Sequence, residues 1–442
     1  MKQDISGLKE GLAAQFRDAM AEGMATGKAT NPVSEAQAIA AYGQVDGVRR
    51  YREQQETIAT GAKIQEVKTM PTAAMKDFLE SSKPPPGDGF YDRQQNWNAL
   101  YRAVNETVKA RADDPVAFAL DNQTYGMTPL GSVQNVQAVM AETQKRRAAM
   151  FNVSRDYGTP PALFSKQEAH AIGNYLATLQ TPDKAGYLGQ LAANGGADGV
   201  LSLSLQLKDK DMELATAANL AGQSSTMGRN NGQLYLEGKD LIAQKLIKID
   251  KADETGIRAQ INALLFDVYQ TPQGRELAEE AAFGIYAKLA HEGKSGEAGI
   301  RQAVNLATGG IMKFNGGNLA KPYGWTDSAF QDAVNISLPQ AITKAGGEFY
   351  MGGQKISAAE LAIKLPGARL QTGGSPGTYL VMSGNVPVMR ADGRPYILDV
   401  GRAPPVERKE GVAKPLEVIT PWSTNDRPER EPGPLEIKWP WL

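Results

Sequence analysis

The sequence predicts a mainly α-helical protein of several helical segments, with a small antiparallel β unit near the C-terminus and an extended proline-rich tail. Three observations support this fold class. Apolar residues recur at helical spacing, behind capping residues, through most of the chain up to residue 345. Short β-type runs split by turn-forming clusters follow in residues 346–401. From Arg402 onward, eight prolines stand among mixed charges, which leaves no regular element.

Composition limits the classes of function. A chain of 442 residues with a hydrophobic fraction of 41% can fill the cores of two or three domains. The formal net charge of −1 does not predict a polyanion-binding surface over the whole chain, and the absence of cysteine excludes thiolate zinc sites and thiol catalysis. Asp4, Lys9 and Glu10 stand where a signal peptide needs an apolar core, and no run approaches the roughly 18 apolar residues of a membrane-spanning helix.

The first two segments are an N-terminal helical region over residues 1–82 and a linker over residues 83–91. The helices of 1–82 have a thin apolar face, so we expect them to pack on another chain rather than make their own core. The linker contains KPPPGDG, in which three prolines remove backbone donors and two glycines allow a turn. We therefore expect a domain boundary at this linker.

A second helical segment is expected over residues 92–161. Its first helix ends before ADDPVAF, where Pro115 suits the first turn of a new helix capped by Asp113 or Asp114. Residues 132–150 predict another amphipathic helix, with three cations, KRR, near its C-terminus. Cations there suit the helix dipole, and we prefer that interpretation to a nucleic-acid-binding patch.

Residues 162–345 predict a helical domain. Ser165 and Glu168 have the spacing of a capping box, so His170 falls one turn inside an ordinary helix rather than in a metal site. Two Thr-Pro pairs, Thr181–Pro182 and Thr271–Pro272, open further helices, and the first of these is expected to stop at NGG (194–196). Residues 200–207 alternate with period two, as a strand does, but their flanks are helical and we expect a helix there.

Two motifs that resemble catalytic signatures fail on inspection. In HEGKS (291–295), Ser295 stands where a zinc-protease helix needs histidine, and no strand precedes the glycine as in a phosphate-binding loop; His291 instead suits a helix C-terminus. In GGSPG (373–377), Pro376 has no N–H to offer an oxyanion. Paired carboxylates for sugar cleavage are not identifiable from sequence, because their separation is spatial. We assign no catalytic, cofactor-binding or metal-binding residue.

The segment over residues 346–401 has three β-type runs, split by SGN and ADGR, and one capped helix, SAAELAIKL. So small an antiparallel unit is marginal alone, and we expect it to pack against the helical domain or another subunit. The final segment, residues 402–442, holds three of the five tryptophans of the chain.

Several stretches of the chain resemble one family of proteins. They are RADDPVAFAL (111–120), FSKQEAHAIGNYLATLQTPDKAGYLGQLAANGG (164–196), YLEGKDLIAQ (235–244) and the region from GREL (274) onward. Their pattern of helices and caps is similar to that of the large internal virion, or ejection, proteins of tailed bacteriophages. The resemblance covers roughly half of the chain. Such proteins often carry a peptidoglycan-cleaving domain, but its glutamate-serine helix and following G-L-x-Q match are not found here.

The resemblance implies a structural protein, not an enzyme. It implies packaging inside the virion near the portal, exit with the genome, and a part in a conduit across the host cell envelope. The implied partners are the portal, other ejection proteins and, without sequence specificity, the DNA genome; no cofactor is implied. Two alternatives stay open: an external tail or portal-adjacent adaptor protein, and a muralytic enzyme with unrecognised carboxylates.

We expect Trp422, Trp439 and Trp441 to dock on a neighbouring subunit or another virion protein. Tryptophan removes much apolar area from water, and proline limits the entropy that an extended arm loses on binding. The expected working form is therefore a homo-oligomer, in the shape of a ring. The alternative for this charged segment is a solvent-exposed tail.

Overall fold

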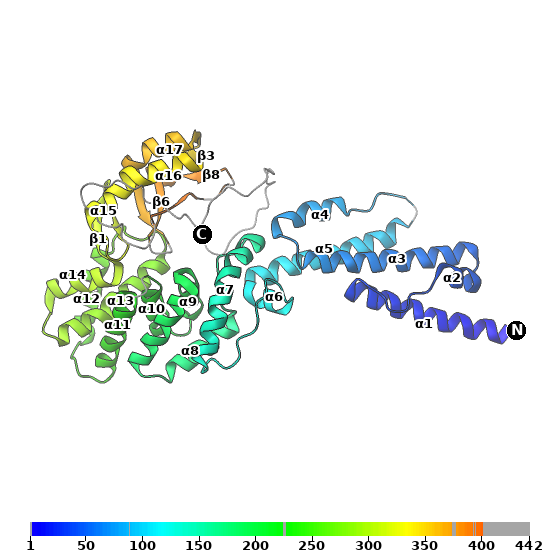
Figure 1. Ribbon diagram of the computed structural model, residues 1–442, viewed down its shortest axis with the longest axis horizontal. Coiled ribbons are helices and arrows are strands. Elements are labelled where there is room, and N and C mark those ends of the chain that lie inside the picture. The colour runs from blue at the N-terminus through cyan, green and yellow to red at the C-terminus, as the bar shows by residue number, and fades with distance from the viewer. Residues whose placement is uncertain are drawn as a thin grey trace. The chain divides into compact units, whose positions relative to one another are not determined.

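The computed structural model describes residues 2–87, 89–223, 227–373, 377–391, 393 and 395–400. This part of the chain is mainly helical, with small antiparallel sheets near its C-terminal end, as the sequence predicts (Figure 1). The proline-rich tail expected over residues 402–442 lies outside the described residues.

Two compact units divide the chain. Unit 1 comprises Met1–Pro129 and Ala148–Ser165, and unit 2 comprises Leu130–Arg147 and Lys166–Leu442. Helix α7 (Val136–Tyr157) contributes its first turns to unit 2 and its last turns to unit 1. Each unit has buried apolar clusters of its own.

Helices are the regular elements of unit 1 among its described residues, and loops connect them. Helix α1 packs along α3, and α3 packs along α5 (Figure 1). The α-helices are α1 (Lys2–Thr26), α2 (Glu35–Tyr42), α3 (Gln44–Val67), α4 (Met75–Ser81), α5 (Phe90–Asp113), α6 (Pro115–Asp121) and the last turns of α7.

Small residues let α1 and α3 approach closely. A Cβ atom added to Gly61 in α3 would lie 1.9 Å from the carbonyl oxygen of Gly23 in α1, far inside contact distance. A buried cluster fills the space beside α1 and α2 with Leu12, Phe16, Val33, Ala38 and Ala41. The expectation that residues 1–82 make no core of their own is therefore wrong. Close backbone packing brings many atoms into dispersion contact, and this offsets the thin apolar face.

The segment predicted as a linker over residues 83–91 connects α4 to α5, but it does not separate compact units. The two sides share one cluster of Val67, Met75, Leu79, Leu100 and Val104. The indole N–H of Trp97 in α5 also donates to the carbonyl of Leu79 in α4 at 3.1 Å. The prolines therefore end one helix and reverse the chain, and the expected domain boundary is wrong.

Arg111 ties the end of α3 to α5. Its buried guanidinium donates to the carbonyl oxygens of Met70 at 2.8 Å and Lys68 at 2.9 Å, and to Oγ1 of Thr72 at 3.0 Å. The ring centroid of Tyr157 lies 4.1 Å from the guanidinium carbon. The charge therefore satisfies carbonyls that a helix C-terminus leaves without intrahelical partners.

Several predicted helix starts are confirmed. Asp114 caps α6 by accepting from the N–H of Ala117 at 2.9 Å, which decides between the two candidate caps. Helix α8 begins at Lys166, directly after Ser165. The hydroxyl of Thr271 accepts from the N–H of Gly274, with Pro272 in the first turn of α13. These starts depend on local chemistry, so the sequence alone locates them.

Helix α7 differs from the prediction. The helix expected over residues 132–150 continues well past that range, so the basic residues 145–147 stand in its interior and the helix-dipole interpretation is wrong. The side chain of Arg146 is fully buried. Its Nη1 lies 2.7 Å from Oε2 of Glu168, and its Nε lies 3.1 Å from Oε1 of Glu142. The partner Glu168 is the residue that the sequence places at capping-box spacing from Ser165.

The helical part of unit 2 begins with the first turns of α7. It continues with α8 (Lys166–Ala177), α9 (Thr181–Leu207), α10 (Met212–Gln223), α11 (Met227–Ala243), α12 (Lys251–Leu264), α13 (Pro272–His291) and α14 (Gly296–Thr308). The expected stop at residues 194–196 is confirmed: Gly196 has a non-helical backbone, with φ 76° and ψ 167°, and a second helical stretch of α9 follows it. Residues 200–207 are helical, as predicted, with Val200, Leu203, Ser204 and Leu207 buried at helical spacing.

A hairpin interrupts the region predicted as helical over residues 162–345. Strands β1 (Ile311–Phe314) and β2 (Gly317–Ala320) pair antiparallel. Their turn residues, Asn315 and Gly316, have φ angles of 45° and 82°. Asn-Gly is the preferred pair for the positive φ angles of a two-residue hairpin turn, so this strand pair had a sequence signal that the prediction overlooked.

The predicted antiparallel β unit follows. It comprises β3 (Glu348–Met351), β4 (Gln354–Ser357), β5 (Arg369–Thr372), β6 (Thr378–Ser383), β7 (Val386–Pro387), β8 (Met389–Arg390) and β9 (Ile397–Asp399). The strand orders are β4-β3-β8 and β5-β6-β7, with β9 paired to β6. Helix α17 (Ala358–Lys364) lies between β4 and β5 in the chain, with the predicted capping box formed by Ser357 and Glu360.

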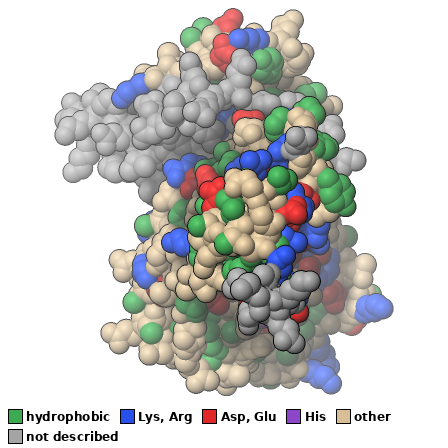
Figure 2. All heavy atoms as spheres, turned by 90° about the vertical axis from the view of Figure 1, so that its right-hand side faces the viewer, with side chains coloured by type: hydrophobic (Ala, Val, Ile, Leu, Met, Phe, Trp, Pro, Cys, Tyr) green, Lys and Arg blue, Asp and Glu red, His purple; other side chains and the backbone are tan. Residues whose placement is uncertain are grey.

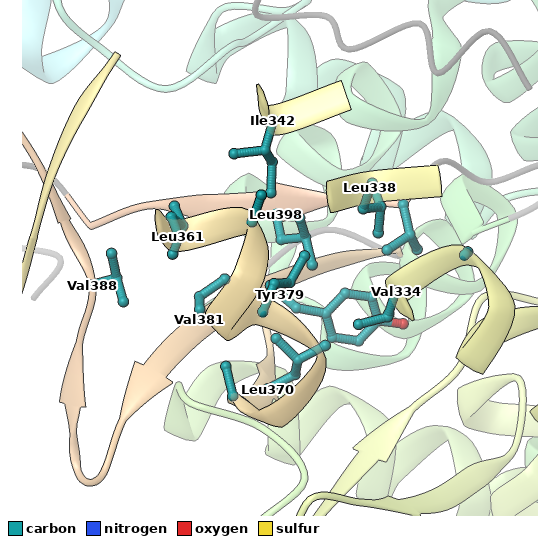
Figure 3. Packing of buried hydrophobic residues seen from close by; sticks show 14 of the residues in the cluster. Val334, Leu338, Ile342, Leu361, Leu370, Tyr379, Val381, Val388 and Leu398 are labelled. Carbon is teal, nitrogen blue, oxygen red and sulfur yellow. The ribbon is translucent and has the colours of Figure 1, made fainter. Parts of the chain in front are cut away.

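The β unit packs against the helical part of unit 2, as expected. The hydroxyl of Tyr379 donates to the carbonyl of Ala320 at 2.7 Å, and the N–H of Thr372 donates to the carbonyl of Val268 at 3.1 Å. Helices α15 (Asp327–Asp332) and α16 (Leu338–Ala345), joined by a π-helical turn (Ala333–Ser337), contribute to the same core. Figure 3 shows this core, with Val334, Leu338 and Ile342 from the helical side and Tyr379, Val381 and Leu398 from the strands.

Candidate functional site

The tryptophans predicted to dock on a partner, Trp422, Trp439 and Trp441, lie outside the described residues. The serine and proline of GGSPG, Ser375 and Pro376, lie outside them as well. The structure therefore brings none of these residues into a described site.

The two histidines lie far apart in the chain and on different helices. His170 is a partly buried residue of α8, with Nδ1 3.3 Å from Nζ of Lys210. His291 is the exposed last residue of α13, where a cation suits the helix dipole. Across the residues that the structure describes, no group of three or more His, Asp or Glu side chains is placed to hold a metal ion.

Removing either histidine is expected to change the stability of the protein little. His170→Ala and His291→Ala should each cost about 1 kcal/mol of unfolding free energy or less, the usual scale for helix surface changes. Urea denaturation of the purified variants is the measurement. A loss of several kcal/mol in either variant would contradict the interpretation of these histidines as ordinary helix residues.

Polar residues on α11, α12 and α13 form a cluster of ion pairs in unit 2. This charge cluster comprises Tyr235, Lys239, Arg258, Glu279 and Glu280. Oε1 of Glu280 lies 2.8 Å from Nζ of Lys239, and its Oε2 lies 2.9 Å from Nη2 of Arg258. The Arg258 guanidinium also lies over the ring of Phe283, 4.1 Å from its centroid. The sequence held a signal for this site, because AEEAAF places two carboxylates on a helix face that is otherwise apolar.

The pKa values of two glutamates near this charge cluster are shifted in opposite directions. Burial alone would raise the pKa of Glu280, but hydrogen bonds and attraction from Lys239 and Arg258 lower it below its ordinary value. Burial raises the pKa of Glu213 at the start of α10, in spite of the opposing effect of Lys184 and Lys239. Acid–base hydrolysis needs two carboxyl groups with different pKa values, one that gives a proton and one that stays ionised.

The contacts of the charge cluster indicate that it holds three helices together. One described hollow is beside α1, lined by Asp18, Glu22 and Thr30, and another is between α16 and α17. The ion pairs of Glu280 instead connect three helices, because Lys239, Arg258 and Glu280 come from α11, α12 and α13 respectively.

The opposite pKa shifts of Glu280 and Glu213 predict opposite effects of pH on the stability of their variants. The pKa of Glu280 is lower in the folded state, so its stabilisation is present above the unfolded pKa and is lost as pH falls through the folded value. Glu280→Gln should therefore cost about 1–3 kcal/mol at pH 7 and less in acid.

Glu213→Gln is the matched variant. Folding raises the pKa of Glu213, so removing its carboxyl group should stabilise the protein at pH 7. That gain should be lost as the pH falls below the unfolded pKa. Denaturation between pH 3 and pH 8 measures both, and equal pH profiles for the two variants would contradict the assignment.

Charges of both signs are mixed on the surface. Figure 2 shows Lys and Arg side chains beside Asp and Glu among the described atoms of one face. This agrees with the formal net charge of −1 and produces no field of a single sign over that face. None of the described helices combines the length and apolar character needed to cross a membrane.

Comparison with known proteins finds no match to a family model, to a curated protein or to a solved structure.

Proposed function

We propose that this chain is a structural protein of a tailed bacteriophage, packaged inside the virion near the portal. It leaves with the genome and helps to form a conduit across the host cell envelope. The observation that carries the proposal is the resemblance of its helix and cap pattern to ejection proteins. The resembling stretches form α6, α8, α9, α11 and α13, so the pattern belongs to folded helices.

The organisation of the chain supports passage through a narrow portal. In unit 1, the buried apolar residues are divided among small clusters, each formed by a few neighbouring helices. Segments with separate cores open locally at a lower free energy than one large core does. A chain built in this way can unfold and refold in stages during ejection.

The proposed working form is a homo-oligomeric ring that contacts the portal or other ejection proteins. Contact with the genome is without sequence specificity in this proposal, and the net charge of −1 keeps its electrostatic part small. After ejection the partner is the host envelope.

Protease treatment of intact and emptied particles tests the location. An internal protein is shielded in full particles, and we expect it to be absent from particles that have released their genome. Electron-microscopy reconstructions before and after release should show density beside the portal only in the first state. Digestion in intact particles would instead favour the alternative of an external tail or portal-adjacent adaptor.

One observation bears on the muralytic alternative, namely the opposite pKa shifts of Glu213 and Glu280. Zymography on peptidoglycan with the wild-type chain and with Glu213→Gln tests it. The proposed structural role predicts no clearing by either protein. Clearing that Glu213→Gln abolishes would make the protein an enzyme.

A further inference from the structure

A groove of about 730 Å³ lies between α16 and α17. These two helices pack against each other over the core shown in Figure 3. The wall of the groove is largely apolar, and it includes Pro339, Thr343, Lys344, Ala359, Ile363 and Pro366. A groove of this composition suits an apolar segment rather than a polar metabolite.

Two independent features mark this groove. Ile363 is 80% exposed and Ile336 is 45% exposed, so large aliphatic side chains stand uncovered in and beside it. The chain also forms a π-helical turn over Ala333–Ser337, directly before α16, and Asn335 of that turn lines the groove. Such turns are rare and occur frequently at functional sites.

The path of the chain brings a candidate occupant close. Leu398 and Val400 are buried in the core beneath the two helices, so the chain leaves unit 2 from the same module. Residues 435–442, LEIKWPWL, follow farther along and contain Trp439 and Trp441. Residues 401–434 can span up to about 110 Å when extended, far more than a contact within the same module needs. That length is also sufficient to reach a neighbouring copy, and the experiment below separates the two cases.

Charge also matches. Lys344 lines the groove, and Lys364 ends α17 beside Ile363. The segment LEIKWPWL contains Glu436 and, two residues later, Lys438. With Glu436 toward the ammonium groups of the groove and Lys438 away from them, the contact has one favoured orientation.

We propose that the groove between α16 and α17 receives residues 435–442 of a neighbouring copy of this chain. Trp439 and Trp441 bury their rings against Ile363, Pro339 and Pro366, and Pro440 limits the entropy lost on docking. A donor segment and an acceptor groove on one chain form a head-to-tail contact, and such a contact builds a ring when the rotation between successive copies closes. The proposal rests on the oligomeric part of the proposed function and identifies the contact that builds it.

Thiol cross-linking in the full chain tests the contact, because the natural sequence has no cysteine. Gln340→Cys places a thiol on the exposed groove wall, and Lys438→Cys places one between the acidic residue and the tryptophans. A mixture of the two single variants, treated with a short bis-maleimide, should give cross-linked dimers. Glu297→Cys on α14, whose side chain is 72% exposed, is the matched acceptor control and should give none with Lys438→Cys.

A second substitution checks that the cross-link depends on the groove itself. Ile363→Glu should lower the cross-linking yield at least fivefold, whereas Val45→Glu, at a position that is 82% exposed in unit 1, should leave it unchanged. Equal yields from Gln340→Cys and Glu297→Cys would overturn the proposal. So would a cross-link that forms only within one chain in the Gln340→Cys/Lys438→Cys double variant, because the groove would then hold its own tail.

The failure of this inference is distinguishable from failure of the proposed function. If the chain sediments as an oligomer and is shielded inside particles but shows no cross-link from Gln340→Cys, the groove assignment is wrong and the proposed function stands. If the cross-link forms but the protein is digested in intact particles, the internal location is wrong and the contact stands.

Discussion

Replacing Arg146 by alanine is expected to lower the free energy of unfolding by about 3–5 kcal/mol. The guanidinium is fully buried and bonds to two carboxylates, with Nη1 2.7 Å from Glu168 and Nε 3.1 Å from Glu142. Those carboxylates are only 11% and 13% exposed. Without the arginine, two like charges remain in a poorly solvated place, and a buried charge without its partner is costly.

Lys145→Ala is the matched control for this variant. Lys145 is the preceding residue on the same helix, its side chain is 53% exposed, and it pairs with Glu142 at 3.6 Å. An exposed pair of this kind contributes about 0–1 kcal/mol. Urea denaturation of the two variants measures the difference, and similar midpoints for both would show that the buried pair does not stabilise unit 2.

Gly61→Ala is expected to cost about 3 kcal/mol, at the upper end of the range for overpacking. The added Cβ would lie 1.9 Å from the carbonyl oxygen of Gly23 and 2.8 Å from Cα of Met24. The obstacle is the backbone of α1, which cannot turn aside as a flexible side chain can. The helices must therefore separate and lose contacts along the whole α1–α3 interface.

Gly11→Ala tests whether the effect comes from packing or from helix propensity. Gly11 is exposed in α1, and a Cβ atom at this position meets nothing within 4 Å. Alanine favours the helix by about 1 kcal/mol relative to glycine, so this variant should be more stable than the wild type. Thermal denaturation of both variants measures the contrast, and a stabilising Gly61→Ala would contradict the close approach of α1 and α3.

Much of the fold could be predicted from the sequence, because helix starts and turns depend on neighbouring residues. Asp114 before Pro115, Thr271 before Pro272, and Ser357 with Glu360 satisfy backbone N–H groups only a few positions away. The hairpin at Asn315–Gly316 had the same kind of local signal.

The candidate sites depended less on local signals. The charge cluster joins Lys239, Arg258 and Glu280 from three helices, and the acceptor groove joins two helices around a π-helical turn. In the sequence these charges look like ordinary solvent-facing residues at helical spacing. Only AEEAAF in α13, with carboxylates on an otherwise apolar face, pointed to a buried ion pair.

The sequence by itself determined the mainly helical class, the helix starts at Lys166 and after Asp114, and the β unit before the tail. Only the tertiary structure decided that Arg146 is buried, that Gly61 is a contact point, and that the proline-rich loop joins two helices of one core. The physical reason is the range of the interactions. Caps and turns act between residues a few positions apart, whereas burial, ion pairing and backbone contact depend on which distant segments meet.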